Sequence, residues 1–280
     1  MKTLKNLFVM TFACMFLMTA CKKEENAAPA PQDNPGAAGQ SFTVKMTDAP
    51  GDFEALDVKV VSVEAYLEGQ GWVTIDNRAK AINVVSLTNG IETEIAVKNN
   101  AQAGVYTKLK VKFDPQAELK LNAYALANYG GIIKSDNRVD LVWLYSGANE
   151  VEIAINETVT AQTGAEVLLD FDAAASVIED GNKYLLQPVI REIKDARTGI
   201  QGEVEGQANA AIVITDGTNT FATYINAEGK FMLKGIKPGV YKLIIDPAAK
   251  AIDDVEKQNK ELSGVVIVEG QITQMGKIAL

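Results

Sequence analysis

The segment AEGKFMLKGIKPGVYKLII, residues 227–245, alternates apolar and polar side chains around two turn signals. Glu-Gly at 228–229 and Pro-Gly at 238–239 favour tight turns, because Gly reaches a positive φ and Pro fixes φ near −65°. Phe231 follows the first turn and Tyr241 the second, and each opens a run in which every other residue is apolar. A period of two places one face of each run against a core. The segment therefore predicts two β-strands joined by tight turns.

The same pattern extends from residue 41 to the C-terminus. Further strands are predicted over 42–46, 58–67, 72–75, 106–113, 119–121, 139–145, 151–155, 167–171, 184–193, 202–204, 211–214, 220–224, 265–268 and 275–280. Such a series of short strands with turn signals between them favours β-sandwiches or barrels. We expect an all-β protein with two tandem sandwich domains of the immunoglobulin or prealbumin type, over residues 41–194 and 195–280.

One segment departs from the strand pattern. Residues 246–264, DPAAKAIDDVEKQNKELSG, space their apolar residues three or four apart between Asp246 and Gly264. An N-capping Asp followed by Pro, with Gly beyond the last apolar residue, is typical of a helix. We expect one short helix or an ordered loop there.

The composition excludes most common catalytic and metal-binding sites that depend on His or Cys. The 280 residues include no His, and the two cysteines, Cys14 and Cys21, both lie at the N-terminus. Ser-His-Asp triads, catalytic cysteines, zinc fingers and disulfide frameworks are therefore not expected in the body of the protein. A formal net charge of −9, with no basic stripe, argues against nucleic acid as a partner.

The first 20 residues are predicted to be a signal peptide. Lys2 and Lys5 precede an apolar run over 7–18, and this run would span ~18 Å as a helix, too short for a ~30 Å hydrocarbon core. Small residues then lead directly into Cys21. The alternatives are an ordinary signal with an incidental Cys and a signal that ends in a lipidated Cys.

The residues around Cys21 resemble the lipobox of bacterial lipoproteins, although Met18 stands where Leu is usual. The resemblance implies that Cys21 is lipidated and becomes the first mature residue. The following Lys-Lys-Glu-Glu resembles an export signal that places lipoproteins on the outer face of the outer membrane. Residues 21–40 are rich in Pro, Ala and Gly and favour a disordered linker. We expect a lipid-anchored protein of the outer membrane that faces the cell exterior.

Both expected domains are similar to known families. The GKFMLKGIKPGVY motif at 229–241 resembles carboxypeptidase-regulatory-like, or transthyretin-like, domains, which implies a carbohydrate-binding-like fold without catalytic residues. Residues 41–194 resemble a bacterial domain-of-unknown-function family, number 4382, through Thr-Asp-Ala-Pro at 47–50, Leu-Asp-Phe-Asp at 169–172 and Tyr-Leu-Leu-Gln-Pro-Val-Ile at 184–190. This second resemblance implies a fold relationship and no established activity.

Carboxylates provide one set of candidate site residues. Asp170 and Asp172 lie two apart on a predicted strand, so both are expected on one face, away from Leu169 and Phe171. With Asp48 they could bind calcium, and as a pair they could serve a glycosidase. A solvent-facing strand, or carboxylates that accept backbone N–H groups at a turn, would explain them without any site, and we favour this interpretation. Asp48 itself lies in DAPG, where an Asp is expected to cap its own turn.

Aromatic residues provide the second set. Tyr124 and Tyr129 lie in NAYALANYGG, which is predicted to be a polar, flexible loop ending in Gly, where exposed rings could stack on sugar faces. Together these observations predict a non-catalytic surface lipoprotein without a required cofactor. It would bind or present a glycan or an envelope protein, with the membrane reached through its N-terminal lipid. The alternatives are a fimbrial or secretion-type subunit that assembles by strand exchange and a carboxylate-dependent glycoside hydrolase.

Overall fold

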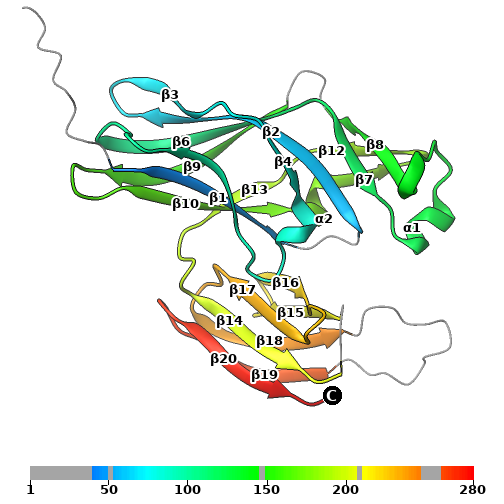
Figure 1. Ribbon diagram of the computed structural model, residues 1–280. Coiled ribbons are helices and arrows are strands. Elements are labelled where there is room, and N and C mark those ends of the chain that lie inside the picture. The colour runs from blue at the N-terminus through cyan, green and yellow to red at the C-terminus, as the bar shows by residue number, and fades with distance from the viewer. Residues whose placement is uncertain (1–39, 50–52, 145–148, 207–209, 247–259) are drawn as a thin grey trace, which may run out of the picture. The chain divides into compact units, whose positions relative to one another are not determined.

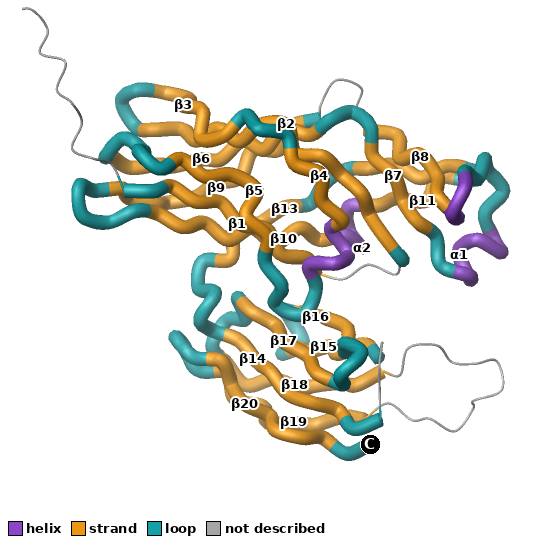
Figure 2. Tube along the Cα trace, viewed as in Figure 1, coloured by secondary structure: helices purple, strands orange, loops and turns teal. Residues whose placement is uncertain are grey.

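The structure is a computed structural model that describes residues 40–49, 53–144, 149–206, 210–246 and 260–280 (Figure 1). The predicted signal peptide, Cys21 and nearly all of the linker lie outside these residues. The described chain is built almost entirely from β-strands, which confirms the predicted all-β class (Figure 2).

Two sheets form an N-terminal sandwich. The smaller sheet has the order β13-β10-β1-β5, made by Ile190–Ile193, Ala165–Asp172, Phe42–Ala49 and Thr93–Lys98. The larger has the order β11-β12-β8-β7-β2-β6-β9, made by Val177–Asp180, Lys183–Leu186, Arg138–Trp143, Ala117–Lys120, Ala55–Leu67, Gly104–Phe113 and Glu150–Val159. β3 (Gly71–Asp76) and β4 (Lys80–Asn83) also pair with the long strand β2.

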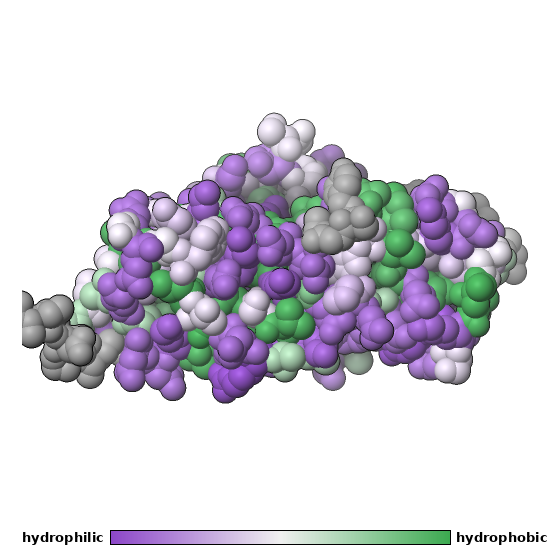
Figure 3. Space-filling model, turned by 90° about the horizontal axis from the view of Figure 1, so that it is seen from above, coloured by the Kyte–Doolittle hydropathy of each residue, from purple (hydrophilic) through white to green (hydrophobic). Residues whose placement is uncertain are grey.

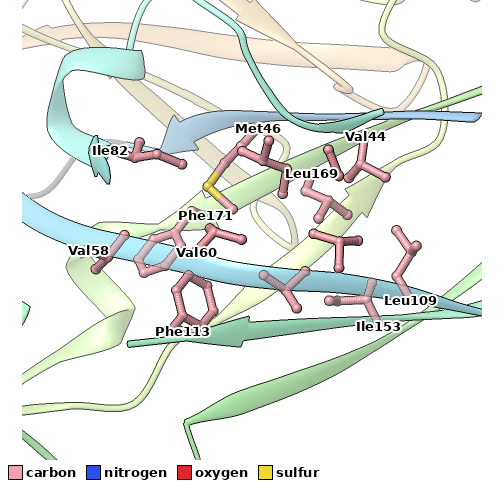
Figure 4. Close-up of a cluster of buried hydrophobic side chains, with 14 of the residues drawn as sticks. Val44, Met46, Val58, Val60, Ile82, Leu109, Phe113, Ile153, Leu169 and Phe171 are labelled. Atoms are coloured by element: carbon pink, nitrogen blue, oxygen red, sulfur yellow. The ribbon is translucent and has the colours of Figure 1, made fainter. Parts of the chain in front are cut away.

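One hydrophobic core fills this sandwich. Val44 and Met46 of β1 and Leu169 and Phe171 of β10 are fully buried. They pack against alternate residues of the larger sheet, including Phe113 (Figure 4). Phe113 and Phe171 meet edge to face, with ring centroids 6.3 Å apart. The period-two pattern of the sequence thus becomes the inner faces of two sheets.

Two more sheets form a C-terminal sandwich with a separate core. One has the order β17-β14-β20, made by Lys230–Lys234, Gly199–Val204 and Ile272–Ile278. The other has the order β16-β15-β18-β19, made by Thr220–Tyr224, Ala211–Thr215, Gly239–Asp246 and Lys260–Ile267. Strands β13 and β14 lie on either side of the predicted boundary between 194 and 195. The domain limits themselves stay a prediction, as does the transthyretin-like resemblance of this sandwich.

The first turn of the opening segment forms as predicted. Gly229 has a φ of 79°, and the residue after the next, Phe231, is buried in the C-terminal core. At the second turn, Gly239 already belongs to strand β18, and the positive φ falls on Gly235, at 71°. Strand β18 begins at Gly239, directly after Pro238, and Tyr241 is buried within it. Local turn chemistry therefore sets where these strands begin.

The helical elements are short, and sequence patterns did not predict them. They are η1 (Val84–Leu87), α1 (Ala123–Asn128), η2 (Ser135–Asn137) and α2 (Ala173–Ser176). The helix predicted over 246–264 is wrong at its C-terminal end, because residues 260–264 begin strand β19, with Gly264 at a φ of 77°. Its centre, residues 247–259, lies outside the described residues.

On the face shown in Figure 3, hydrophilic residues predominate and hydrophobic residues form small separate groups. None of the helices in the described part of the chain is long and apolar enough to cross a bilayer.

Candidate functional site

Parallel pairing of β1 with β10 gathers the predicted carboxylates at one end of the smaller sheet. The register places Thr47 opposite Asp170 and Asp48 opposite Phe171. Asp172 ends β10 and begins the short helix α2. Residues more than a hundred positions apart in the chain thus become neighbours.

Asp170 is a buried partner of an arginine. Only 4% of the residue is exposed, and Arg191 lies directly opposite it on β13. The arginine donates to Oδ2 from Nε at 2.8 Å and from Nη2 at 2.6 Å. The solvent-facing position considered for Asp170 is therefore wrong. Strand β10 lies between two other strands, and its neighbour β13 supplies the guanidinium group that covers the carboxylate. Arg191 also lies over the ring of Phe221, 5.7 Å from its centroid.

Asp172 caps helix α2. Its Oδ1 accepts a hydrogen bond from Ala175 N at 2.9 Å, as N-cap residues do. The same residue's carbonyl accepts from the Ser176 hydroxyl. The interpretation of this carboxylate as an acceptor of backbone N–H groups at a turn is therefore confirmed.

Asp48 lies on the core side of β1. Its Oδ1 accepts from Ala173 N at 3.2 Å, whereas its buried Oδ2 has no hydrogen-bond partner in the described part of the chain. Burial raises the pKa of Asp48 to about 9, and the nearby carboxylates of Asp170 and Asp172 add to the rise. The carboxyl is therefore protonated at neutral pH. The turn that it was predicted to cap includes residues 50–52, which lie outside the described residues. Within the described residues, strand β1 continues through Asp48 and its side chain points inward, toward Ala173.

A small cavity adjoins these residues. It has a volume of about 40 Å³ and is lined by Thr47, Asp170 and Arg191 together with Asn89 and Thr223. This volume suits ordered water, and it is far too small for a sugar. Thr47 closes one wall, with its hydroxyl 2.9 Å from the carbonyls of Leu87 and Ile91.

The chemistry available to the carboxylates is limited by these contacts. Asp170 is neutralised by Arg191, Asp172 is held at a helix N-terminus, and Asp48 carries a proton. Among the residues that the structure describes, no group of three or more Asp, Glu, Cys or His side chains is placed to hold a metal ion. As it stands, the arrangement stabilises the junction of β1, β10 and α2.

The two predicted tyrosines are placed differently. Tyr124 on α1 is 78% exposed, so its ring faces solvent. Tyr129 stacks on Tyr184, with ring centroids 5.2 Å apart and an interplanar angle of 20°, and packs against the core. Tyr124 thus has a ring available for stacking, whereas one face of Tyr129 is already occupied.

A pair of glutamates at the edge of the N-terminal sandwich was not predicted from sequence. Glu157 of β9 and Glu192 of β13 both have a raised pKa, caused first by burial and opposed by Lys194. The Lys194 Nζ lies 3.9 Å from the Glu192 Oε2, and the Glu192 side chain is only 7% exposed. Each glutamate stands at an inward position of its strand, and this is visible in the sequence. Their proximity cannot be predicted until β9 and β13 are known to be neighbours.

Several solved structures are similar to this chain at low identity. The TIE protein of Bacillus anthracis is 8% identical, with 85% of this chain and 40% of that chain covered and a TM-score of 0.21. The shaft pilin SpaA of Lactobacillus rhamnosus GG is 8% identical, with coverages of 86% and 97% and a TM-score of 0.22. BcpA, the major pilin subunit of Bacillus cereus, is 10% identical, with coverages of 86% and 69% and a TM-score of 0.21. The chain spans less than half of the TIE protein's length, and similarity at this level says nothing about function.

No curated protein matches the chain. A family does match: its sequence model, described as "Domain of unknown function (DUF4382)", covers residues 40–188, which is more than half of the chain and includes the β1–β10–α2 junction. The chain therefore belongs to the DUF4382 family.

Proposed function

We propose that this protein is a non-catalytic, lipid-anchored surface module that binds or presents a glycan or protein partner at the outer membrane. The observation that carries the non-catalytic part is the engagement of all three candidate carboxylates in the fold. Asp170 pairs with Arg191, Asp172 caps α2, and Asp48 accepts from Ala173 N. The lack of His and of Cys beyond Cys21 supports the same view. We assign neither calcium nor any other cofactor.

The anchor is the lipidated Cys21, which follows a short apolar leader and precedes an extended linker. Several fatty chains on one Cys hold a protein firmly, because each buried CH₂ contributes ~0.8 kcal/mol. We expect the full-length protein to incorporate labelled palmitate and to be cleaved by protease added to intact cells. Cys21→Ser should lose the label and the membrane association, with Cys14→Ser as the matched control. Unlabelled wild-type protein recovered from the medium would contradict the anchor.

The binding role rests on Tyr124, whose exposed ring suits stacking on a sugar face. We expect the full-length protein to bind members of a glycan array, and Tyr124→Ala to weaken that binding roughly tenfold while Tyr124→Phe, which keeps the ring, preserves it. Equal binding by all three proteins would exclude this tyrosine. Turnover of any glycan that is lost in Asp170→Asn or Asp172→Asn would instead favour the hydrolase alternative.

A further inference from the structure

Several exposed sheet edges in this protein are closed by side chains. On β17, the Asn89 amide accepts from Met232 N at 2.7 Å and donates to Lys230 O at 3.1 Å. On β5, Asp76 accepts from Val97 N at 3.3 Å. On β19, the Thr273 hydroxyl donates to Val266 O at 2.9 Å. Closing an edge in this way removes the free backbone groups on which another strand could add.

The edge of β11 is open. This strand is the last of the larger sheet and pairs with β12 alone. Gln187 N donates to Ser176 O at 2.8 Å. This bond shows which residues of β11 form hydrogen bonds to β12, namely every second residue counted from Ser176. Because inward and outward backbone groups alternate, Val177 and Glu179 direct their N–H and C=O groups away from β12. The Val177 N–H lies at the C-terminal end of α2, where it closes the last helical turn. Within the described ranges, no hydrogen bond from another element reaches the outward groups of Glu179.

An exposed apolar row ends at this edge. Val142 of β8, Leu185 of β12 and Ile178 of β11 are direct cross-strand neighbours. Tyr184 and Leu186, on either side of Leu185, are buried, so the row lies on the outer face of the sheet. Val142 is 50% exposed and Ile178 is 38% exposed. A strand added to β11 would extend the row and cover Ile178, because cross-strand apolar pairs stabilise a sheet.

The charge of the edge indicates which strand it accepts. Glu179 and Asp180 are both exposed and acidic, and Lys183 forms an ion pair with Asp180, at 3.2 Å. Pairing of β11 with the same strand of a second copy would gather four acids on two short strands. A segment with basic residues would be attracted instead.

We propose that the open edge of β11 binds an extended segment of a partner protein by strand addition. The segment carries an aliphatic residue beside Ile178 and a lysine or arginine beside Glu179. This inference rests on the proposed function only in treating the protein as a binding module. It does not involve Tyr124, the glycan or the lipid. Outward backbone groups give the affinity, and the apolar row and Glu179 give the specificity.

The test uses the purified full-length protein and an end-capped hexapeptide of alternating valine and lysine, with a valine–glutamate hexapeptide as the control. We expect the basic peptide to bind by calorimetry and to slow hydrogen exchange at the Glu179 amide. The acidic peptide should bind at least tenfold more weakly. Failure of the wild-type protein to bind the basic peptide, or equal binding of both peptides, would overturn the proposal. Tyr124→Ala should leave peptide binding unchanged, so this result is separable from the glycan result.

Three variants locate the binding at the edge. Glu179→Pro removes one outward N–H without touching the ladder to β12, a position where an edge strand tolerates Pro. Glu179→Gln keeps that N–H and removes the charge. We expect a loss of at least tenfold for the first variant and of a few-fold for the second. If Glu179→Pro does not fold, Ile178→Lys, which keeps every backbone group, should also reduce binding at least tenfold. Unchanged affinity in the folded variants would place the peptide elsewhere and refute the proposal.

Discussion

In each sandwich, a tyrosine near the start of one strand donates the same kind of hydrogen bond to a backbone carbonyl. In the N-terminal sandwich, the Tyr106 hydroxyl donates to Gln102 O at 2.8 Å. In the C-terminal sandwich, the Tyr241 hydroxyl donates to Lys237 O at 2.9 Å. Both rings are buried, and both tyrosines follow a Gly-Val pair and reach back to the carbonyl four residues earlier. A local sequence therefore builds the same corner in two different cores, as tyrosine corners do in other sandwiches.

The sandwiches differ in what else they bury. The N-terminal one buries two aspartates, Asp48 and Asp170. In the described part of the C-terminal one, the buried polar residues are Thr198 and Thr223, which carry no charge. Buried carboxyl groups make stability depend on pH, whereas neutral hydroxyls do not. The comparison therefore predicts that the pH dependence of folding originates mainly in the N-terminal sandwich.

The largest effect is expected from Asp48. Its folded pKa of about 9 lies far above the ~3.9 of an unfolded aspartate, so the folded state keeps a proton that the unfolded state releases. The free energy of unfolding should therefore fall as pH rises from about 4 to about 9, by at most ~1.4 kcal/mol per pH unit. Asp48→Asn retains the acceptor for Ala173 N and should remove this slope. Urea denaturation at pH 5 and pH 8 measures it.

A wild-type protein whose stability does not change between these two pH values would contradict a buried, protonated Asp48. Thr223→Val provides the matched control in the C-terminal sandwich. It removes a buried hydroxyl without altering a titratable group, so it should lower stability by the same amount at both pH values.

The next effect concerns Asp170. Arg191→Met leaves this carboxylate buried without its arginine, and breaking a buried pair from one side costs ~3–5 kcal/mol. Because Arg191 is 54% exposed, we expect a smaller loss of about 2–4 kcal/mol in urea denaturation at pH 7. Asp170→Leu combined with Arg191→Met should recover much of the loss. A single Arg191→Met variant as stable as the wild type would show that the pair does not hold β10 to β13.

A smaller effect of opposite sign is expected from Asp76. Hydrogen bonds from Arg78, followed by those from backbone N–H groups, lower its pKa to about 2. This stabilisation is present above the unfolded pKa of ~3.9 and is lost as pH falls from about 4 to about 2. Asp76→Asn should cost about 1 kcal/mol at pH 7, since Arg78 is largely exposed, and clearly less at pH 2, where the folded carboxyl is about half protonated. An equal cost at both pH values would contradict the ionic origin.

The sequence predicted features that depend on neighbouring residues and missed those that depend on strand pairing. The turn at 228–229 and the buried Phe231 follow from residues adjacent in the chain. The partner of Asp170 does not, because Arg191 comes opposite it only through the register of β10 and β13. Asp48 likewise meets Ala173 only because β1 pairs in parallel with β10. Alternation predicts the face of a residue, whereas burial depends on which strands lie beside it.

Helix α1 shows the same limit. Its six residues are too few for a helical period to be recognised, and its start is capped by a side chain, Asn122, whose Oδ1 accepts from Ala125 N at 2.8 Å. The polar composition of this segment predicted a loop. The helix nevertheless leaves Tyr124 exposed, so the candidate binding residue was identified even though its local structure was not.

The smallest effect tests the tyrosine corners directly. Tyr106→Phe and Tyr241→Phe each remove one hydroxyl and leave the ring in place. Each should lower the free energy of unfolding by about 1 kcal/mol, the usual net value of one hydrogen bond. The two hydrogen bonds have similar lengths, and each joins residues four positions apart in the chain. The two losses of stability should therefore agree within about 0.5 kcal/mol. Tyr66→Phe, an exposed tyrosine beside Trp72, should have almost no effect. If removing one hydroxyl lowers the free energy of unfolding several-fold more than removing the other, the surrounding core, and not the shared local sequence, determines how much the hydrogen bond stabilises.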